Sequence, residues 1–190
     1  MSTYSARLTA LREQLAANRL DGFVVPLTDE HMSEYVGAYA QRLAWLTGFQ
    51  GSAGSAVVLP AEAAIFVDGR YTLQAQDQVD QSIFAIVHIT DTPPERWLES
   101  NLIAGAKLGY DPWLHTIDGV ERLARACSNA GATAAPIESN PIDMIWTARP
   151  APPPACARKC GLRLAPLRAP EHQTDSGGRL GGRTPGTRGR

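Results

Sequence analysis

The sequence predicts an α/β domain in which helices flank a mixed β-sheet. Short apolar runs alternate along residues 1–148 with segments whose apolar residues recur at helical spacing, an alternation typical of α/β folds. Two of the runs, residues 56–59 and 64–67, are separated only by a short connection that contains Pro60, which predicts an antiparallel hairpin. One hairpin within an otherwise alternating pattern makes the expected sheet mixed.

The expected strands are short, and Val, Ile and Phe dominate the two at the hairpin. These two runs carry no charged residue and are bounded by turn residues, as expected of strands buried on both faces. Pro26 closes the first expected strand, and Asp111 follows the fifth. The expected strands are residues 23–25, 56–59, 64–67, 83–89, 107–110 and 133–137.

The expected helices are identified by apolar spacing and by capping residues. The first is amphipathic, ends near Asn18, and places on one face Leu8, Leu11 and Leu15. Thr92 and Thr116 are the expected N-caps of two later helices, and Gly131 ends the second of these. The inner faces of these two helices are expected to carry Trp97, Leu98, Leu102, Val120, Leu123 and Ala124. The later helices are expected at residues 34–46 (weakly), 70–79, 93–104, 117–129 and 140–146.

The glycine-rich segment at residues 48–55 invites comparison with phosphate-binding loops. A P-loop requires a Lys after its last glycine, and none follows here. A dinucleotide-binding fingerprint requires a helix after the glycines, whereas a strand is expected from Ala56. The segment is therefore interpreted as a tight turn between a helix and a strand.

Nothing in the residues alone specifies catalysis or metal binding. Asp80 and Asp91 have a spacing that dinuclear hydrolases can use, but no His followed by two Glu on later strands completes such a set. His88 and His115 are interpreted as surface or structural residues. Ser52 and Ser55 lack the G-x-S-x-G context of an activated nucleophile. No catalytic residue and no metal ligand is predicted.

Charge divides the chain into an acidic body and a basic tail. Residues 1–150 hold 17 of the 19 acidic residues, whereas residues 151–190 hold 8 of the 18 Lys and Arg. The tail contains no Ile, Val, Phe, Trp or Tyr, so residues 149–190 are predicted to be disordered and rich in Pro, Gly and Arg. Two interpretations stay open: an out-of-frame translation of a GC-rich gene, or a basic tail that binds nucleic acid nonspecifically. Without a signal peptide or a membrane-length apolar run, the expected location is cytoplasmic.

Five stretches in a fixed order resemble one known family. They are DEHMSEY at 29–35, RLAWLTGFQGSAGSAVV at 42–58, IFVDGRYTLQAQ at 65–76, LGYDPWLHT at 108–116 and NPIDMIW at 140–146. Together they resemble the N-terminal domain of Xaa-Pro aminopeptidases (aminopeptidase P), of the creatinase/prolidase type. The chain looks most similar to the long, three-domain cytoplasmic form. The resemblance covers residues 1–148 and stops near Pro150, so it implies a first domain that ends before the catalytic domain.

The resemblance implies what such a domain does. The family removes an N-terminal residue that precedes proline, using two metal ions, usually manganese, held by two Asp, one His and two Glu in the C-terminal domain. None of those positions exists here, so this chain is expected to hold no cofactor and to be inactive alone. By resemblance, its domain helps the full enzyme to dimerise and borders the substrate cleft.

The residues expected to face that cleft or a partner are polar and lie in the matched loops. They are His31, Glu34, Tyr35, Asp68 and Arg70. A structural alternative stays open, in which Asp68 caps the helix that starts at Arg70 and Arg70 pairs with a carboxylate inside the domain. A further alternative is a free-standing module that pairs with a full-length paralogue, and a last one is nucleic-acid binding by the tail.

Overall fold

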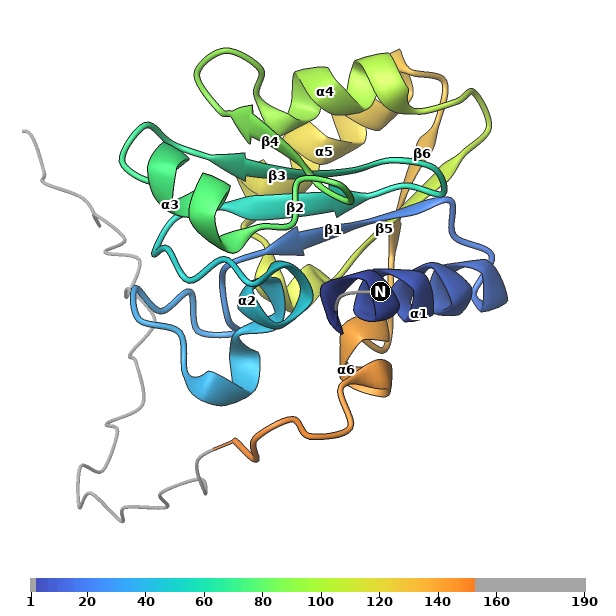
Figure 1. Cartoon of the computed structure of the whole chain (residues 1–190). Helices are drawn as coiled ribbons and strands as arrows, with labels where there is room; N and C mark the ends of the chain where they lie inside the picture. The colour runs from blue at the N-terminus through green and yellow to red at the C-terminus, as the bar shows by residue number, and fades with distance from the viewer. Residues whose placement is uncertain (1–2, 153–190) are drawn as a thin grey trace, which may run out of the picture. The chain divides into compact units, whose positions relative to one another are not determined.

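A computed structural model describes residues 3–152 of the chain. They form a six-stranded sheet with the order β4-β3-β2-β1-β5-β6 (Figure 1). Its strands are β1 (Gly22–Pro26), β2 (Ser55–Val58), β3 (Ala63–Val67), β4 (Ala85–His88), β5 (Lys107–Tyr110) and β6 (Thr133–Pro136). The six strands lie at the expected positions, although β4 is shorter than expected.

The sheet is mixed because β2 alone runs opposite to the other strands. It pairs antiparallel with β1 and with β3, and the predicted hairpin is confirmed by partners such as Ala56 and Ile65. The pairs β3–β4, β1–β5 and β5–β6 are parallel. Five strands therefore end, and β2 begins, at one edge of the sheet, which we call the carboxyl edge. Loops far apart in sequence meet there.

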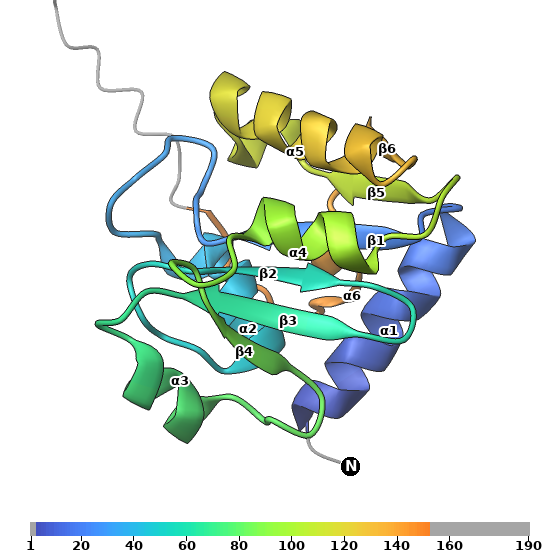
Figure 2. The ribbon, with the colours of Figure 1, turned by 90° about the horizontal axis from the view of Figure 1, so that it is seen from above.

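Helices cover both faces of this sheet (Figures 1 and 2). The helices are α1 (Thr3–Ala17), α2 (Arg42–Thr47), α3 (Thr72–Gln78), α4 (Pro94–Asn101), α5 (Ile117–Asn129) and α6 (Pro141–Ile145). Two 3₁₀ turns, η1 (Ala38–Ala40) and η2 (Pro112–Leu114), lie in the connections. Helices α1, α2, α3 and α6 pack on one face, and α4 and α5 pack on the other.

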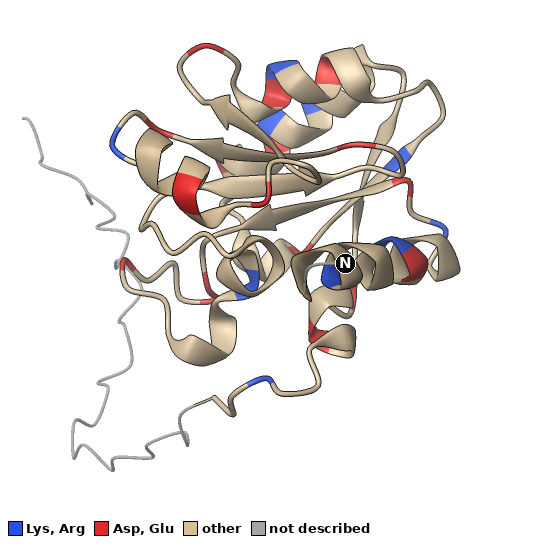
Figure 3. Ribbon diagram, in the orientation of Figure 1, with Lys and Arg blue, Asp and Glu red and all other residues tan. Residues whose placement is uncertain are grey.

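The alternation of side chains along the strands produces two hydrophobic layers. Val25 and Ala56 face the layer that contains α1, whereas Val24 and Val57 face the layer under α4 and α5. Every residue of β3 is buried, as predicted for a strand covered on both sides. Among the six strands only Lys107, at the start of β5, is charged, and the other charges lie on helices and loops (Figure 3).

Thr116 and Gly131 mark the two ends of α5, as the sequence predicted, and α6 also has an N-cap. Thr116 Oγ1 accepts a hydrogen bond from the Gly119 amide at 3.1 Å, which caps α5. Gly131 follows α5 with φ = 71°, in the left-handed region that favours glycine. Asn140 Oδ1 caps α6 by accepting a bond from the Ile142 amide at 3.1 Å.

Other local predictions were wrong. The N-cap of α4 is Pro93 rather than Thr92, and its side chain makes no capping bond, because Pro94 rather than Pro93 is the first helical residue. Ala124 is exposed; α5 instead buries Ala126 and Cys127, which share a face with Leu123 at helical spacing. The weak helix at 34–46 is only η1 and α2, and the helix expected from Arg70 begins at Thr72.

The glycine-rich segment connects α2 to β2 as a structural turn. Gly48 ends α2 with φ = 86°, and a Cβ at this position would lie 2.8 Å from the carbonyl oxygen of Gln78. Both the left-handed backbone and the close approach of another segment require glycine there. This geometry agrees with the interpretation of the segment as a turn.

In the part of the chain that the structure describes, no helix is long and apolar enough to cross a membrane. The tail predicted at residues 149–190 lies, from residue 153 onward, outside the described residues. The two interpretations of that tail therefore stay predictions.

Candidate functional site

The predicted site residues lie in loops at the carboxyl edge of the sheet. His31, Glu34 and Tyr35 belong to the loop that follows β1, and Asp68 and Arg70 follow β3. The glycine-rich turn before β2 lies between these loops, because β2 is hydrogen-bonded to both strands. In open α/β sheets, ligands bind preferentially outside the carboxyl ends of the strands.

A cavity of about 280 Å³ brings Glu34 and Tyr35 together with the glycine-rich turn. Its wall includes Phe49, Gly51 and Ser52, all from that turn. Phe49 is fully buried, whereas the Tyr35 side chain is 83% exposed at the rim. An exposed aromatic beside a carboxylate gives this cavity both an apolar and a charged contact.

Asp68 and Arg70 form an exposed ion pair. Arg70 Nη2 lies 2.7 Å from Asp68 Oδ2, and the Arg70 amide donates to Asp68 Oδ1 at 2.9 Å. The Arg70 hydrogen bonds lower the pKa of Asp68, and the same bonds raise the pKa of Arg70. The carboxylate that Arg70 was expected to find inside the domain is thus Asp68, which closes the turn before α3 rather than capping the helix.

Ser52 connects the two halves of this surface. Its Oγ lies 2.6 Å from the Tyr71 hydroxyl oxygen, and the hydrogen bonds with Ser52 lower the pKa of Tyr71. The Arg70 guanidinium carbon lies 5.2 Å from the centre of the Tyr71 ring. The surface therefore runs from Tyr35 through Ser52 and Tyr71 to Arg70. Because the partner of Ser52 is Tyr71 and not a His or a carboxylate, this is not the geometry of an activated nucleophile.

His31 occupies a different position on the same loop. It is exposed and does not line the cavity with Glu34; its amide donates to Asp29 Oδ1 at 3.0 Å. Asp29 is only 3% exposed and also accepts from the Ser33 amide at 2.9 Å. Burial acts to raise the pKa of Asp29, but the bonds from Ser33 and His31 outweigh it and hold the pKa below its usual value. Asp29 thus fixes the shape of the loop.

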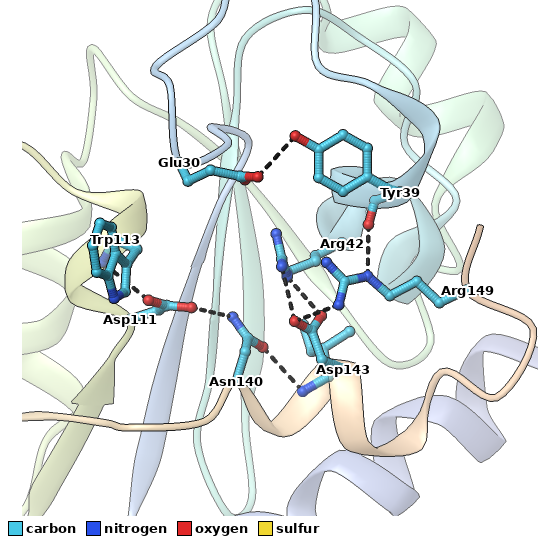
Figure 4. A network of polar contacts seen from close by, with 9 residues as sticks. Glu30, Tyr39, Arg42, Asp111, Trp113, Asn140, Asp143 and Arg149 are labelled. Atoms are coloured by element: carbon cyan, nitrogen blue, oxygen red, sulfur yellow. Dashed lines mark hydrogen bonds and ion pairs between the residues drawn. The ribbon is translucent and has the colours of Figure 1, made fainter. Parts of the chain in front are cut away.

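The structure also contains a partly buried ion-pair network that the sequence did not reveal (Figure 4). Arg42 Nε and Nη2 each donate to one oxygen of Asp143 at 2.8 Å. Arg149 Nη1 approaches Asp143 Oδ2 at 2.7 Å, and Arg149 Nε donates to the Tyr39 carbonyl at 2.7 Å. Arg42 is 6% exposed, so this bidentate pair lies largely out of water. Its partners are 101 residues apart in sequence.

Three further contacts extend the network along the carboxyl edge (Figure 4). Asn140 Nδ2 donates to Asp111 Oδ2 at 2.9 Å, and Asp111 Oδ1 accepts from the Trp113 amide at 3.0 Å. The Tyr39 hydroxyl donates to Glu30 at 2.9 Å. The only signal in the sequence was the NPIDMIW stretch, whose Asn and Asp stand where a short helix begins. It could not indicate that Asp143 pairs with an arginine on α2.

The histidines weighed for metal binding have separate surroundings. His115 Nδ1 lies 2.8 Å from the Asp111 carbonyl, and its Nε2 is buried with no hydrogen-bond partner in the described part of the chain. Burial lowers the pKa of His115 below its usual value. His88 ends β4 beside Gly69. Within residues 3–152, no group of three or more His, Cys, Asp or Glu could hold a metal ion, and Asp80 and Asp91 form no such group.

Similarity to known proteins covers nearly the whole described region. Residues 7–146 match the family model of the creatinase/prolidase N-terminal domain. Xaa-Pro aminopeptidase 2 from Homo sapiens is 39% identical over 147 residues, which are 77% of this chain and 22% of that protein. The probable Xaa-Pro aminopeptidase P from Aspergillus flavus is 35% identical over 152 residues, 78% of this chain and 23% of that protein. The chain therefore spans less than a quarter of the length of these relatives.

Solved structures agree with this match. The X-prolyl aminopeptidase from Caenorhabditis elegans, described as a cytosolic enzyme with a di-nuclear active site, superposes with a TM-score of 0.73 at 31% identity. The match covers 79% of this chain and 26% of that one. The N-terminal domain of the cytoplasmic peptidase PepQ from Mycobacterium tuberculosis superposes with a TM-score of 0.55 at 27% identity, over 74% of this chain and 98% of that one. The chain thus belongs to the creatinase/prolidase N-terminal domain family.

Proposed function

We propose that this chain serves as the non-catalytic N-terminal domain of an Xaa-Pro aminopeptidase in the cytoplasm. The observation that carries the proposal is the match of residues 7–146 to this domain family. The relatives that share the domain are Xaa-Pro aminopeptidases, and the aligned residues make up only 22% of the human protein. In this proposal the removal of a residue before proline belongs to the remainder of such an enzyme.

The donor set of the described residues supports this division of roles. A di-nuclear centre requires carboxylates and imidazole gathered around two ions, and residues 3–152 do not fit that requirement because they offer no cluster of three such ligands. We therefore assign no step of the hydrolytic reaction to the residues of this region.

An activity assay tests the absence of catalysis. The purified 190-residue chain is incubated with Mn²⁺ and the peptide Ala-Pro-Ala, with the Caenorhabditis elegans X-prolyl aminopeptidase as the positive control. We expect no release of the N-terminal residue above a protein-free blank. Metal-dependent release that scales with the concentration of this protein through successive purification steps contradicts the proposal.

We assign the roles of cleft border and dimer contact to the carboxyl edge. Four polar residues support the assignment, because Glu34, Tyr35, Asp68 and Arg70 lie around one surface that Ser52 and Tyr71 connect. Tyr35 is the most exposed large hydrophobic residue of the described region. His31 does not line the cavity, so we assign it to the contact with a partner and not to the cleft. Exposed aromatic and arginine side chains are the types that dominate interface energetics.

Light scattering after size exclusion tests the dimer. We expect a concentration-dependent dimer that Tyr35→Ala weakens about tenfold, as removal of an interface aromatic does. Ile103→Ala is the matched control, because Ile103 is also largely exposed (72%) but lies on the opposite edge, and it leaves the association unchanged. A strict monomer over the whole concentration range overturns the dimer, and a monomer that binds only an added full-length Xaa-Pro aminopeptidase favours the module that pairs with a paralogue.

A chimaeric enzyme tests the cleft. Residues 1–152 replace the corresponding domain of the Caenorhabditis elegans enzyme, and Tyr35→Ala and Arg70→Ala are then introduced. We expect a higher KM for Xaa-Pro peptides in both variants and an unchanged KM in Ile103→Ala. Equal KM values in all three variants contradict a role of this edge in the cleft.

A further inference from the structure

A second cavity of about 360 Å³ lies at the carboxyl edge, beside the ion-pair network. Its lining differs completely from that of the cavity around Tyr35. Six charged side chains and one indole define it: Glu30, Arg42, Asp111, Trp113, Glu138, Asp143 and Arg149. These residues come from the loop after β1, from α2, from η2 and its N-cap, from the segment after β6, from α6 and from the segment after α6, so only the folded chain assembles this wall.

Arg42 reaches this wall with one donor group unused. Its Nε and Nη2 are bound to Asp143, but Nη1 is buried and has no hydrogen-bond partner among residues 3–152. In Figure 4 this is the Arg42 nitrogen without a dashed line, on the side of Glu30. A guanidinium carries five N–H donors, and a buried donor without an acceptor is unfavourable. Arg42 lines the cavity, and the described residues supply no acceptor for this donor.

The charges of the wall decide which acceptor fits. The two guanidinium groups at the cavity, Arg42 and Arg149, both pair with Asp143. In residues 3–152, no Lys or Arg pairs with Glu30, Asp111 or Glu138. Three carboxylates without a basic partner repel an anionic ligand, so the acceptor for Arg42 should be a neutral carbonyl on a molecule that also carries positive charge.

Trp113 supplies the remaining feature of the site. It is 74% exposed at the rim, and its backbone is held by the bond of its amide to Asp111. An indole face attracts a guanidinium or ammonium group, and it also packs against the aliphatic stem of Arg or Lys. A metal ion is a poorer candidate, because the carboxylates of this wall form no group that could hold one within the described region.

We propose that this cavity binds a peptide segment of another protein through an Arg or Lys side chain. A backbone carbonyl of the segment accepts the free N–H of Arg42 Nη1. The cationic head of its side chain lies between Glu30 and Glu138, and the stem packs on Trp113. The site shares no lining residue with the cavity around Tyr35, so it adds a docking role to the proposed function.

A titration followed by NMR tests this docking role with three blocked tripeptides. Acetyl-Ala-Arg-Ala-amide is the probe, and the same peptides with Leu or Glu in the centre are the controls, added to the ¹⁵N-labelled 190-residue chain. We expect the Arg peptide to shift the Trp113 indole N–H and the Arg42 Nε–H signals. We also expect it to bind at least about fivefold more tightly than either control, the equivalent of one ion pair of about 1 kcal/mol. Equal binding of the Leu peptide, or no shift at Arg42, overturns the proposal.

Two substitutions that leave the ion-pair network intact sharpen the test. Glu138→Gln removes an exposed carboxylate, and Trp113→Leu removes the indole; each should weaken the Arg peptide about threefold to fivefold. Glu62→Gln, an exposed carboxylate at the opposite edge of the sheet, is the matched control and should change the affinity less than about twofold. Unchanged affinity in both Glu138→Gln and Trp113→Leu contradicts the assigned site.

Discussion

At the scale of single residues, Arg42 joins more distant parts of the domain than any contact foreseen from the sequence. It starts α2, binds Asp143 of α6 with two hydrogen bonds, and lies beside Arg149 through that shared carboxylate. A buried ion pair need not stabilise a protein relative to an apolar pair, but removing one partner leaves a charge out of water. The network therefore fixes where the last helix sits against α2.

Removing the charge of Asp143 tests this role. Asp143→Asn leaves Arg42 buried without its anion, so the free energy of unfolding should fall by about 3 kcal/mol. Urea denaturation followed by circular dichroism measures the change. Glu121→Gln is the control, because Glu121 and Arg125 are exposed and 3.9 Å apart, a geometry worth at most about 0.5 kcal/mol. Similar small losses in both variants would show that the network contributes little.

His115 predicts how stability responds to pH. Burial lowers the pKa of folded His115 below its value in the unfolded chain, so protons bind the unfolded state more readily. His115 therefore contributes to the free energy of unfolding at a pH above its pKa in the unfolded chain. This contribution is lost as the pH falls toward its pKa in the folded protein. His115→Asn retains a donor for the Asp111 carbonyl but cannot titrate. Between pH 7.5 and 5.5 the wild-type chain should lose more stability than His115→Asn, and parallel pH profiles would contradict this.

At the scale of elements, α5 shows which features of a helix can be predicted from residues close in sequence. Its N-cap and its terminal glycine were predicted correctly because each depends on residues within one or two turns, whereas its buried face was predicted only in part. The start of α4 is instead set by proline. Pro93 is its N-cap and Pro94 its first residue, so Thr92 stands one residue too early to bond to the free amide groups of the helix.

A pair of threonine substitutions distinguishes these two helix starts. Thr116→Ala removes the side-chain acceptor for the Gly119 amide and should cost about 1 kcal/mol of stability. Thr92→Ala is the matched control, because its side chain caps no helix, and should lie within about 0.5 kcal/mol of wild type. Chemical denaturation of both variants gives the comparison. A larger loss in Thr92→Ala than in Thr116→Ala would refute the assignment of the caps.

At the scale of the whole described domain, one sheet carries two hydrophobic layers. Leu46 of α2 and Leu98 of α4 are fully buried in different layers, on opposite faces of strands that contribute to both. Because β1, β2 and β3 send alternate side chains into each layer, loss of packing on one face loosens the strands that support the other. The two layers should therefore unfold together.

Truncation in either layer tests this coupling. Leu46→Ala and Leu98→Ala should each destabilise the protein by about 2–5 kcal/mol, the range for buried leucine. Each variant should still unfold in a single transition that near- and far-ultraviolet circular dichroism report at the same denaturant concentration. A biphasic curve in one variant, with half of the helical signal retained, would show that the layers are independent.

The sequence by itself determined the secondary structure and the class of the fold. Apolar runs located all six strands, the short connection at Pro60 located the hairpin, and the ordered stretches identified the family. These features are encoded locally, because backbone preferences, side-chain periodicity and caps depend on neighbours along the chain. The predictions that Ala124 is buried and that Thr92 caps α4 were wrong, because a shift of one position along a helix changes which side chain is buried or can bond to the free amide groups.

Only the tertiary structure decided which polar groups meet. Glu34, Tyr35, Asp68 and Arg70 were singled out one by one, but their common surface depends on the contact of Ser52 with Tyr71. Arg42 and Asp143 come together because five parallel strands end at one edge of the sheet, so the segments that follow β1 and β6 both begin there. Pairing across such distances depends on strand order and on the path of the chain, which residue periodicity does not encode, so the buried arginine and its unused donor became visible only in the folded domain.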